Sequence, residues 1–119
     1  MNVTCEFQYD SAHRLPYVPA GHKCGRLHGH TYTLEVTVSG DVGPVGWVVD
    51  FADVKAAVEP FVALLDHTYL NDVPGLDNPT VEVQLPWLWD RIKAGLPGLT
   101  RLVLQEGVAN SAEYCGPTN

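Results

Sequence analysis

Apolar and polar residues alternate along the first stretch of the chain. Between residues 2 and 9 the apolar positions are Val3, Cys5, Phe7 and Tyr9. Because successive side chains of an extended chain point to opposite faces, this alternation predicts a half-buried strand. Residues 16–27 contain two prolines and two glycines and predict a loop, and a second, longer strand is predicted over residues 29–39.

Shorter strands are predicted elsewhere in the chain. Residues 40–46 read G-D-V-G-P-V-G, which predicts a turn, and residues 47–49 predict a short return strand. Residues 99–106 predict a third main strand and residues 111–115 a short final one. Glu106 continues the apolar face of the third strand, so a carboxylate stands where the pattern asks for an apolar side chain.

Two amphipathic helices are predicted between the pairs of strands. Their apolar stripes are Val54, Val58, Phe61 and Leu65 in the first helix and Val81, Leu85, Leu88 and Ile92 in the second. Asp50 offers an N-cap for the first helix, and Pro60 predicts a kink or a break inside it. The second helix is predicted to start near residues 78–80, to continue past Pro86 and to stop at Gly95.

The resulting order of elements is β-β-α-α-β-β within residues 1–119, which we interpret as one domain. Strand pairs that flank two helices predict an α+β fold, with an antiparallel four-stranded sheet and both helices on one face. Such a small sheet has open edges with unpaired backbone groups. We therefore hypothesise that copies of the chain close their sheets in a cyclic homo-oligomer.

The composition narrows the class of protein. Hydrophobic residues make up 45% of the chain and charged residues 18%, as in globular proteins. The formal net charge of −7 argues against a nucleic-acid partner, because such binding needs clustered lysines and arginines. No apolar run reaches the roughly 20 residues of a membrane span and no leader is evident, so we expect a cytoplasmic location without a membrane partner. Cys5, Cys24 and Cys115 do not indicate a disulfide framework.

The segment K-C-G-R-L-H-G-H-T-Y, residues 23–32, carries the clearest chemical signal. His28 and His30 are two positions apart in the second strand, so they share a face with its apolar row. Imidazoles on a buried face suit a metal ion, and His13 after the first strand would complete a three-histidine zinc site with one open position. The loop is predicted to bring Cys24 to the metal. The alternative is a pair of hydrogen-bonded histidines without a metal.

Basic residues gather near the predicted metal ligands. Arg14, Lys23 and Arg26 are three of the seven lysines and arginines in the chain. A cationic cluster on an acidic chain favours an anionic small-molecule substrate. The alternative is a set of solvated surface cations, because surface charge clusters are common.

Several separated motifs agree with one protein family. They are F-Q-Y-D-S-A-H-R-L (7–15), K-C-G-R-L-H-G-H-T-Y (23–32), G-W-V-V-D-F (46–51), L-D-H-T-Y-L-N (65–71), N-P-T-V-E (78–82) and the strand that ends at Glu106. On these motifs the chain resembles the 6-pyruvoyltetrahydropterin synthase / 6-carboxytetrahydropterin synthase family. Three residues separate Cys24 from the histidine pair, a spacing similar to that of the bacterial carboxy-forming branch.

The resemblance implies a fold, an assembly and an activity. The fold is the tunnelling fold (T-fold), in which trimers close their sheets into a barrel, two trimers stack as a homohexamer, and active sites lie at subunit interfaces. The ligands of Zn²⁺ would be His13, His28 and His30. The activity would be that of a carbon–carbon lyase, converting 7,8-dihydroneopterin triphosphate to 6-carboxy-5,6,7,8-tetrahydropterin with release of acetaldehyde and triphosphate. The product would enter 7-deazapurine (queuosine-type) biosynthesis.

The resemblance also implies catalytic roles. Cys24 would act as the base that removes a proton next to the pterin ring, since a thiol near a divalent cation and beside Lys23 and Arg26 could be partly thiolate at neutral pH. Asp66 and His67 would relay protons in acid–base steps. The alternative for that pair is a histidine at a helix C-terminus that interacts with the helix dipole.

Further residues are implied to contact the substrate. Glu106 would hold the pterin, because a carboxylate accepts two hydrogen bonds from an aminopyrimidinone edge; an exposed strand end is the alternative. Thr80 and Glu82 would shape the pterin pocket, although a helix cap is an equally simple role for Thr80. Lys23 and Arg26 are further candidates for substrate binding, and the sequence leaves open which basic residues would bind the triphosphate. Two rival functions remain open: a pyruvoyl-forming synthase of the same fold and a non-catalytic zinc-binding oligomeric scaffold.

Overall fold

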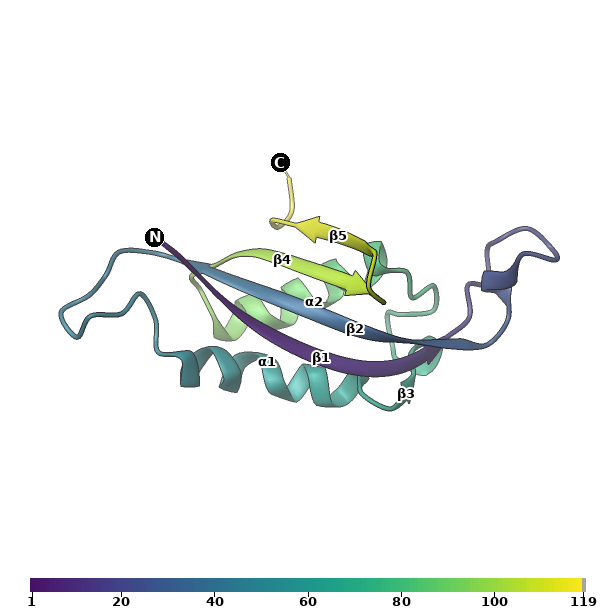
Figure 1. Cartoon of the computed structure of the whole chain (residues 1–119), viewed down its shortest axis with the longest axis horizontal. Helices are drawn as coiled ribbons and strands as arrows, with labels where there is room; N and C mark the ends of the chain where they lie inside the picture. Colours follow the sequence, from purple (N-terminus) through teal and green to yellow (C-terminus); the bar gives the residue numbers. More distant parts are fainter. Residues whose placement is uncertain (119) are drawn as a thin grey trace.

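A computed structural model describes residues 1–118 of the chain (Figure 1). Its main elements are β1 (Asn2–His13), β2 (His28–Ser39), α1 (Phe51–Leu65), β3 (Thr68–Tyr69), α2 (Val81–Gly95), β4 (Leu99–Glu106) and β5 (Asn110–Tyr114). Two short 3-10 turns, η1 (Lys23–Gly25) and η2 (Leu70–Asp72), lie in the connections. The predicted long strands, both helices and the final strand are confirmed, and β1 extends beyond its predicted end at residue 9.

The sheet has five strands in the order β3-β1-β2-β4-β5. The long strands are antiparallel to their neighbours, whereas β3 runs parallel to β1 through the pairs Ser11–Thr68 and Ala12–Tyr69. The predicted four-stranded antiparallel sheet is therefore wrong, since the sheet is mixed. A strand of two residues is too short for alternation to reveal it in the sequence.

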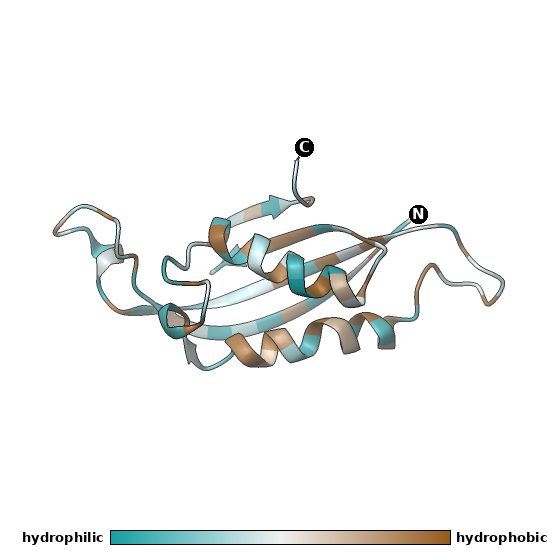
Figure 2. Cartoon of the chain, turned by 180° about the vertical axis from the view of Figure 1, so that it is seen from behind, coloured by the Kyte–Doolittle hydropathy of each residue, from teal (hydrophilic) through white to brown (hydrophobic). Residues whose placement is uncertain are grey.

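Both helices cover the same face of the sheet, as predicted (Figures 1 and 2). The residues buried between the layers include Tyr9, Tyr32, Leu34, Val36, Leu102 and Leu104 from the strands and Val54, Val58, Leu85, Leu88 and Ile92 from the helices. Burying one such aliphatic side chain stabilises the fold by about 1.5–3 kcal/mol. The same burial fixes the strand register, because a slip of one residue would turn each apolar row outward.

The helix starts follow the predicted capping residues. The Asp50 carboxylate accepts a hydrogen bond from the Ala52 N–H at 2.9 Å, and the Thr80 hydroxyl accepts one from the Val83 N–H at 3.2 Å. Of the kink or break predicted at Pro60, the break is wrong, because α1 continues from Phe51 to Leu65, and the kink stays a prediction. Pro60 lies on the exposed face of the helix, where water can bind the carbonyl that loses its partner.

The predicted return strand over residues 47–49 is also wrong, because this segment is irregular. The Gly43 N–H donates to the Trp47 carbonyl at 2.9 Å, so the segment folds back on its own turn. Val48 and Val49 pack against the core without pairing along β1, whose neighbours in the sheet are β2 and β3. The apolar sequence there serves packing and does not add a strand.

One end of the elongated molecule gathers the residues of chemical interest (Figure 1). His13 ends β1, His28 begins β2, and Glu106 ends β4 at that same end. The N-terminus of α2, which begins after Thr80, lies close to them. Within residues 1–118, neither helix combines the length and the apolar character needed to span a lipid bilayer.

Candidate active site

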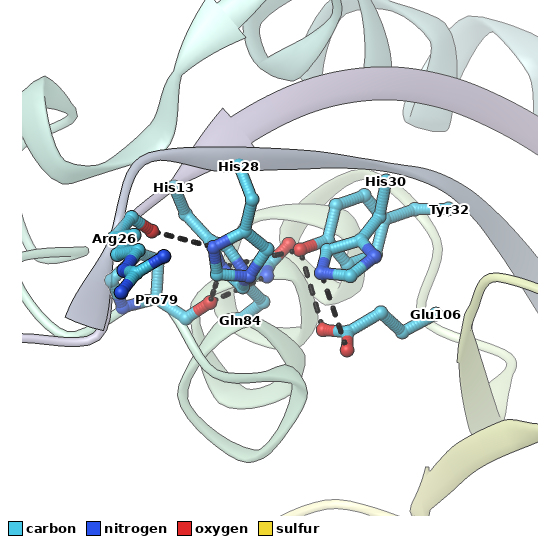
Figure 3. Close-up of polar contacts among 8 residues, drawn as sticks. All are labelled: His13, Arg26, His28, His30, Tyr32, Pro79, Gln84 and Glu106. Atoms are coloured by element: carbon cyan, nitrogen blue, oxygen red, sulfur yellow. Dashed lines mark hydrogen bonds and ion pairs between the residues drawn. The ribbon is translucent and has the colours of Figure 1, made fainter. Parts of the chain in front are cut away.

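The three histidines predicted as metal ligands lie together. The β1–β2 register places His13 directly opposite His28, and His30 opposite Ser11. The ligand atoms of the three rings lie within 4.8 Å of one another, so the cluster could hold a metal ion. Figure 3 shows the three rings side by side along the start of β2. The alternation of β2, with both of its histidines on the buried face, is the cause of this convergence.

The hydrogen bonds of the rings fit a bound cation. His13 Nδ1–H donates to the Pro79 carbonyl at 2.9 Å, and His28 Nδ1–H donates to the Arg26 carbonyl at 2.6 Å. In neutral rings with these donors, each Nε2 carries a lone pair. The two Nε2 atoms face each other at 3.0 Å, and among the described residues His30 Nε2 is buried without a hydrogen-bond partner. Lone pairs that converge in this way could be accepted by a bound cation.

A second layer of hydrogen bonds holds His13 in place. The Pro79 carbonyl that accepts from His13 also accepts from Gln84 Nε2 at 3.0 Å. The Tyr9 hydroxyl donates to Gln84 Oε1 at 2.7 Å, so both ends of the fully buried Gln84 amide are occupied. Partners of this kind orient metal-binding histidines and fix their tautomers. Figure 3 shows Gln84 and Pro79 beneath the histidine rings.

The surroundings favour the metal-binding form of His13. Burial lowers the pKa of His13 below its ordinary value, and the neighbouring His28 and His30 lower it further against the opposing effect of the Pro79 carbonyl. An imidazole with a lowered pKa stays neutral over a wider range of pH. Neutral imidazole is the form that donates a lone pair to a metal.

Glu106 lies beside the histidines on the same face of the sheet. It pairs with Tyr32 across the β2–β4 register, and the Tyr32 hydroxyl donates to Glu106 Oε2 at 3.5 Å. Glu106 Oε1 lies 3.5 Å from His30 Nε2. Both contacts are long, so the carboxylate keeps its capacity to accept stronger hydrogen bonds from a ligand. Burial, with the charge of Glu106 as a smaller cause, raises the pKa of Tyr32, which therefore keeps its proton.

Cys24 lines a cavity with the histidines and the carboxylate. The cavity measures about 530 Å³ and is lined by Lys23, Cys24, His28, Gly29, His30, Glu106 and Asn110. We call it the thiol cavity. Cys24 is half-buried, sits in η1 and lines this cavity together with His28 and His30, whereas its approach to a bound metal stays a prediction. The cavity thus combines imidazoles, one thiol, one carboxylate and one ammonium group.

A second cavity adjoins the first. It measures about 420 Å³, and its lining includes Thr80, Glu82, Glu106 and Asn110. Glu106 and Asn110 line both cavities, so the predicted pocket residues of α2 lie next to the predicted pterin-binding carboxylate. Thr80 also caps α2, which confirms the structural role that the sequence left open for it. A pterin-shaping role for Thr80 and Glu82 stays a prediction.

Asp66 and His67 form a close pair elsewhere. Asp66 is the C-cap of α1, and its Oδ2 lies 2.9 Å from His67 Nδ1. The Asp10 N–H donates to Asp66 Oδ1 at 2.9 Å, and the His67 N–H donates to the Asp10 carbonyl at 2.6 Å. The Asp10 N–H first, and His67 second, hold the pKa of Asp66 below its ordinary value. The His67 side chain is 81% exposed, so the pair is fixed in place yet open to solvent.

His67 of this pair borders a different cavity from that of Cys24. This cavity of about 570 Å³ is lined by Asp10, Ser11, Ala12, Gly29, His30, Thr31, His67, Thr68 and Tyr69. We call it the relay cavity. It shares only Gly29 and His30 with the thiol cavity. Within one chain, the structure does not bring Asp66 and His67 to the wall that carries Cys24.

The basic residues predicted to meet an anion are divided in the structure. Lys23 lines the thiol cavity, whereas Arg14 and Arg26 line a separate hollow of about 330 Å³ in the loop after β1. All three side chains are exposed. The Arg26 carbonyl, and not its side chain, holds His28. These three exposed basic side chains could still attract an anionic substrate to this end of the molecule.

The sequence pattern did not reveal three contributors to the site. Gln84 and Tyr9 support His13, and Asn110 lines both cavities that contain Glu106. A signal existed for Gln84, because a polar residue at this position interrupts the buried stripe of α2. The sequence pattern alone predicts an ordinary core position for Tyr9 and an ordinary turn position for Asn110. Only the three-dimensional contacts give them a role.

Comparison with known proteins gives this arrangement a context. The profile of a family described as 6-pyruvoyl tetrahydropterin synthase matches residues 2–117. A 6-carboxy-5,6,7,8-tetrahydropterin synthase from Synechocystis sp. is 39% identical over 119 residues, which cover 94% of this chain and 91% of that protein. A dihydroneopterin monophosphate aldolase from Pyrococcus furiosus is 41% identical over 102 residues, which cover 83% of each chain.

The fold agrees with the same family. The structure of Caenorhabditis elegans 6-pyruvoyl tetrahydropterin synthase matches with a TM-score of 0.90, over 98% of this chain and 96% of that chain, at 24% identity. At this identity the match speaks for the fold alone. Together with the sequence matches, it confirms the resemblance drawn from the motifs. The chain belongs to the 6-pyruvoyl tetrahydropterin synthase family.

Proposed function

We propose that the protein is a zinc-dependent 6-carboxytetrahydropterin synthase. In this proposal it converts 7,8-dihydroneopterin triphosphate to 6-carboxy-5,6,7,8-tetrahydropterin and releases acetaldehyde and triphosphate. The observation that carries it is the thiol cavity, in which Cys24 and Glu106 share a wall with His28 and His30 of the histidine cluster. The 39% identity to the Synechocystis enzyme of that name supports the choice of reaction.

Zinc is the metal that the donor set favours. Three imidazole nitrogens, with no further ligand in the cluster within residues 1–118, match a catalytic zinc site that keeps an open position. When bound there, Zn²⁺ would supply Lewis-acid polarisation of the substrate's side-chain hydroxyls. His13, His28 and His30 would hold it, with the Pro79 and Arg26 carbonyls fixing two of the rings.

The remaining residues of the two adjoining cavities would bind and activate the pterin. Glu106 would accept hydrogen bonds from the aminopyrimidinone edge, because its carboxylate oxygens make only long contacts within the chain. Thr80 and Glu82 would form the neighbouring wall. Cys24 would remove the proton next to the pterin ring, and Lys23 beside it would attract the triphosphate, with Arg26 further along the loop.

Asp66 and His67 would act from a neighbouring copy of the chain. Their separation from Cys24 within one chain supports this arrangement, as does the solvent exposure of His67. The sheet could pair with the sheets of other copies, because β5 and most of β1 are edges without a partner strand in the described chain. Closure of these edges in a trimeric barrel, and stacking of two trimers as a hexamer, would satisfy the unpaired backbone groups.

The deciding experiment is an assay of both products on protein whose zinc content has been measured. The purified protein is incubated with 7,8-dihydroneopterin triphosphate, and the pterin and the released carbon fragment are identified. The proposal expects 6-carboxytetrahydropterin and acetaldehyde in equal amounts. A pterin that keeps its three-carbon side chain would instead identify a pyruvoyl-forming synthase.

Two other outcomes would reject the proposal. Retro-aldol cleavage to a hydroxymethylpterin and a two-carbon aldehyde that keeps the phosphate would match the aldolase named among the relatives, so dihydroneopterin monophosphate is tested in parallel. No turnover with full zinc occupancy would favour the non-catalytic zinc-binding scaffold. If the proposed product forms, its use in 7-deazapurine (queuosine-type) biosynthesis is checked by supplying it to the next enzyme of such a route.

A further inference from the structure

The hydrogen bonds around Cys24 assign a part to a histidine outside the metal cluster. We infer that His22 is a positioning residue, which holds Cys24 in the thiol cavity by accepting the hydrogen bond of the Cys24 N–H. The inference rests on the proposed function, in which Cys24 is the base. It concerns a residue that neither lines the thiol cavity nor belongs to the histidine cluster.

Both peptide groups of Cys24 are held by the surrounding loop. The Cys24 N–H donates to His22 Nδ1 at 3.0 Å, and the Cys24 carbonyl accepts from the Leu15 N–H at 2.9 Å. His22 is itself fixed, since its N–H donates to the Pro19 carbonyl and its carbonyl accepts from the Gly25 N–H, each at 3.0 Å. These hydrogen bonds hold the backbone of Cys24, from which its sulfur extends. The position of the sulfur therefore depends on the His22 ring and on the chain just after β1.

The role of His22 is that of an N-cap with an unusual side chain. His22 has an extended backbone (φ −68°, ψ 136°) and caps η1, where serine, threonine, aspartate or asparagine are the usual residues. To accept this hydrogen bond, Nδ1 must be unprotonated, so the proton of the neutral ring lies on Nε2. The cap therefore depends on Nδ1 of His22, which accepts the hydrogen bond, and not on Nε2.

Substitution of His22 by asparagine or by glutamine distinguishes a role of its Nδ1 atom from a role of its Nε2 atom. Asparagine places its oxygen at the same number of bonds from Cβ as His Nδ1, and glutamine places its oxygen as far along as Nε2. If the hydrogen bond to Cys24 is what matters, His22→Asn keeps it and His22→Gln loses it. If His22 instead contacts substrate or a partner through Nε2, the order of the two variants is reversed.

The test measures hydrogen exchange of the Cys24 amide together with steady-state kinetics, in the zinc-loaded protein. In His22→Ala and His22→Gln the Cys24 amide should exchange about tenfold faster, the size expected for loss of a helix cap. Turnover should fall by about tenfold in kcat with KM almost unchanged, because Glu106 and the metal ligands are untouched. In His22→Asn both quantities should stay near those of the wild type. Zinc content and circular dichroism of each variant verify that the fold is intact.

The outcomes that overturn the inference are distinct. Equal exchange rates in all variants would mean that the hydrogen bond does not form in solution. Faster exchange without a loss of kcat would mean that the cap does not position Cys24 for chemistry. Rescue by His22→Gln and not by His22→Asn would assign the role to Nε2. If the wild type itself does not convert dihydroneopterin triphosphate, the proposed function fails, while the exchange rates still report on the cap.

Discussion

His13 and His28 face each other across the antiparallel β1–β2 pair, with their Nε2 atoms 3.0 Å apart. Each ring donates its Nδ1–H to a backbone carbonyl, so the facing nitrogens both present lone pairs when the rings are neutral. The proposed metal ion would lie among these rings and accept the lone pairs that face each other. The following predictions start from that relationship.

Replacement of His28 by alanine should remove the metal. One of three imidazole ligands is lost, and the affinity for Zn²⁺ should fall by more than the roughly 10–100-fold that changes outside the ligand set cause. We expect zinc content to drop from about one ion per chain to below about a tenth after dialysis. Metal analysis provides the measurement. His67→Ala is the matched control, since that exposed histidine lies outside the cluster, and full occupancy in the His28 variant would reject the ligand assignment.

Replacement of Cys24 by alanine should separate chemistry from metal binding. Loss of a positioned base lowers turnover by about 10²–10⁴-fold, whereas zinc content should be unchanged because the histidines are intact. Product formation and metal content are measured on one sample. Cys115→Ala serves as the control, because the Cys115 thiol is exposed and outside both cavities around Glu106. A Cys24 variant with the wild-type rate would remove the thiol from the mechanism.

Two inactive variants should complement each other if active sites are shared between chains. Cys24→Ala and His67→Ala are each expected to lose activity alone. Unfolded together and refolded as a mixture, they should recover up to about a quarter of the wild-type activity, since random assembly creates some intact sites. Activity after refolding each variant separately gives the baseline. A mixture no more active than this baseline would place both residues in the same chain's site.

Replacement of Gln84 by leucine should destabilise the fold through one unpaired group. The Tyr9 hydroxyl loses its buried acceptor, which costs about 1–3 kcal/mol in the free energy of unfolding measured with urea. Adding Tyr9→Phe removes the stranded hydroxyl, so the double variant should be the more stable of the two by about 1 kcal/mol. An equal loss in both proteins would show that the hydrogen bond is not the cause.

The metal-free protein should lose stability as the pH falls below about 6.5, the ordinary pKa of histidine. Burial lowers the pKa of His13 in the folded state, so below that pH the unfolded chain binds a proton that the folded chain still rejects. The free energy of unfolding then decreases with falling pH until the lowered folded pKa is passed. His13→Gln should show a shallower decrease in urea unfolding between about pH 7.5 and pH 5.5 with chelator present. The same slope in both proteins would contradict this origin.

Periodicity predicted the part of the site that lies on long strands. His28 and His30 are two residues apart, and Tyr32 and Leu34 continue this spacing, so in a strand all four side chains lie on the same face. The burial of Tyr32 and Leu34 in the core confirms that this face is the one turned toward the helices. Glu106 was found in the same way. These residues were predictable because strand geometry fixes the direction of each side chain over many positions.

The parts of the fold and of the site that the sequence did not predict depend on contacts between segments that are distant in the sequence. β3 is too short to leave a pattern, and residues 47–49 look like a strand but have no neighbour to pair with. The support of His13 by Gln84 requires knowing that Pro79 lies between them. Nor does the sequence tell that Cys24 and His67 border different cavities, because their places follow from the path of two loops.

Gly29, between the two histidines of β2, shapes the molecule behind the metal cluster. A Cβ at this position would lie 3.3 Å from the Ser11 carbonyl oxygen, tighter than nine in ten natural contacts, so a larger residue would require β1 to shift by a few tenths of an ångström. Gly29 also lines both the thiol cavity and the relay cavity. At this point one strand of the chain separates the two cavities, so a bulkier residue at position 29 would change the shape of both at once.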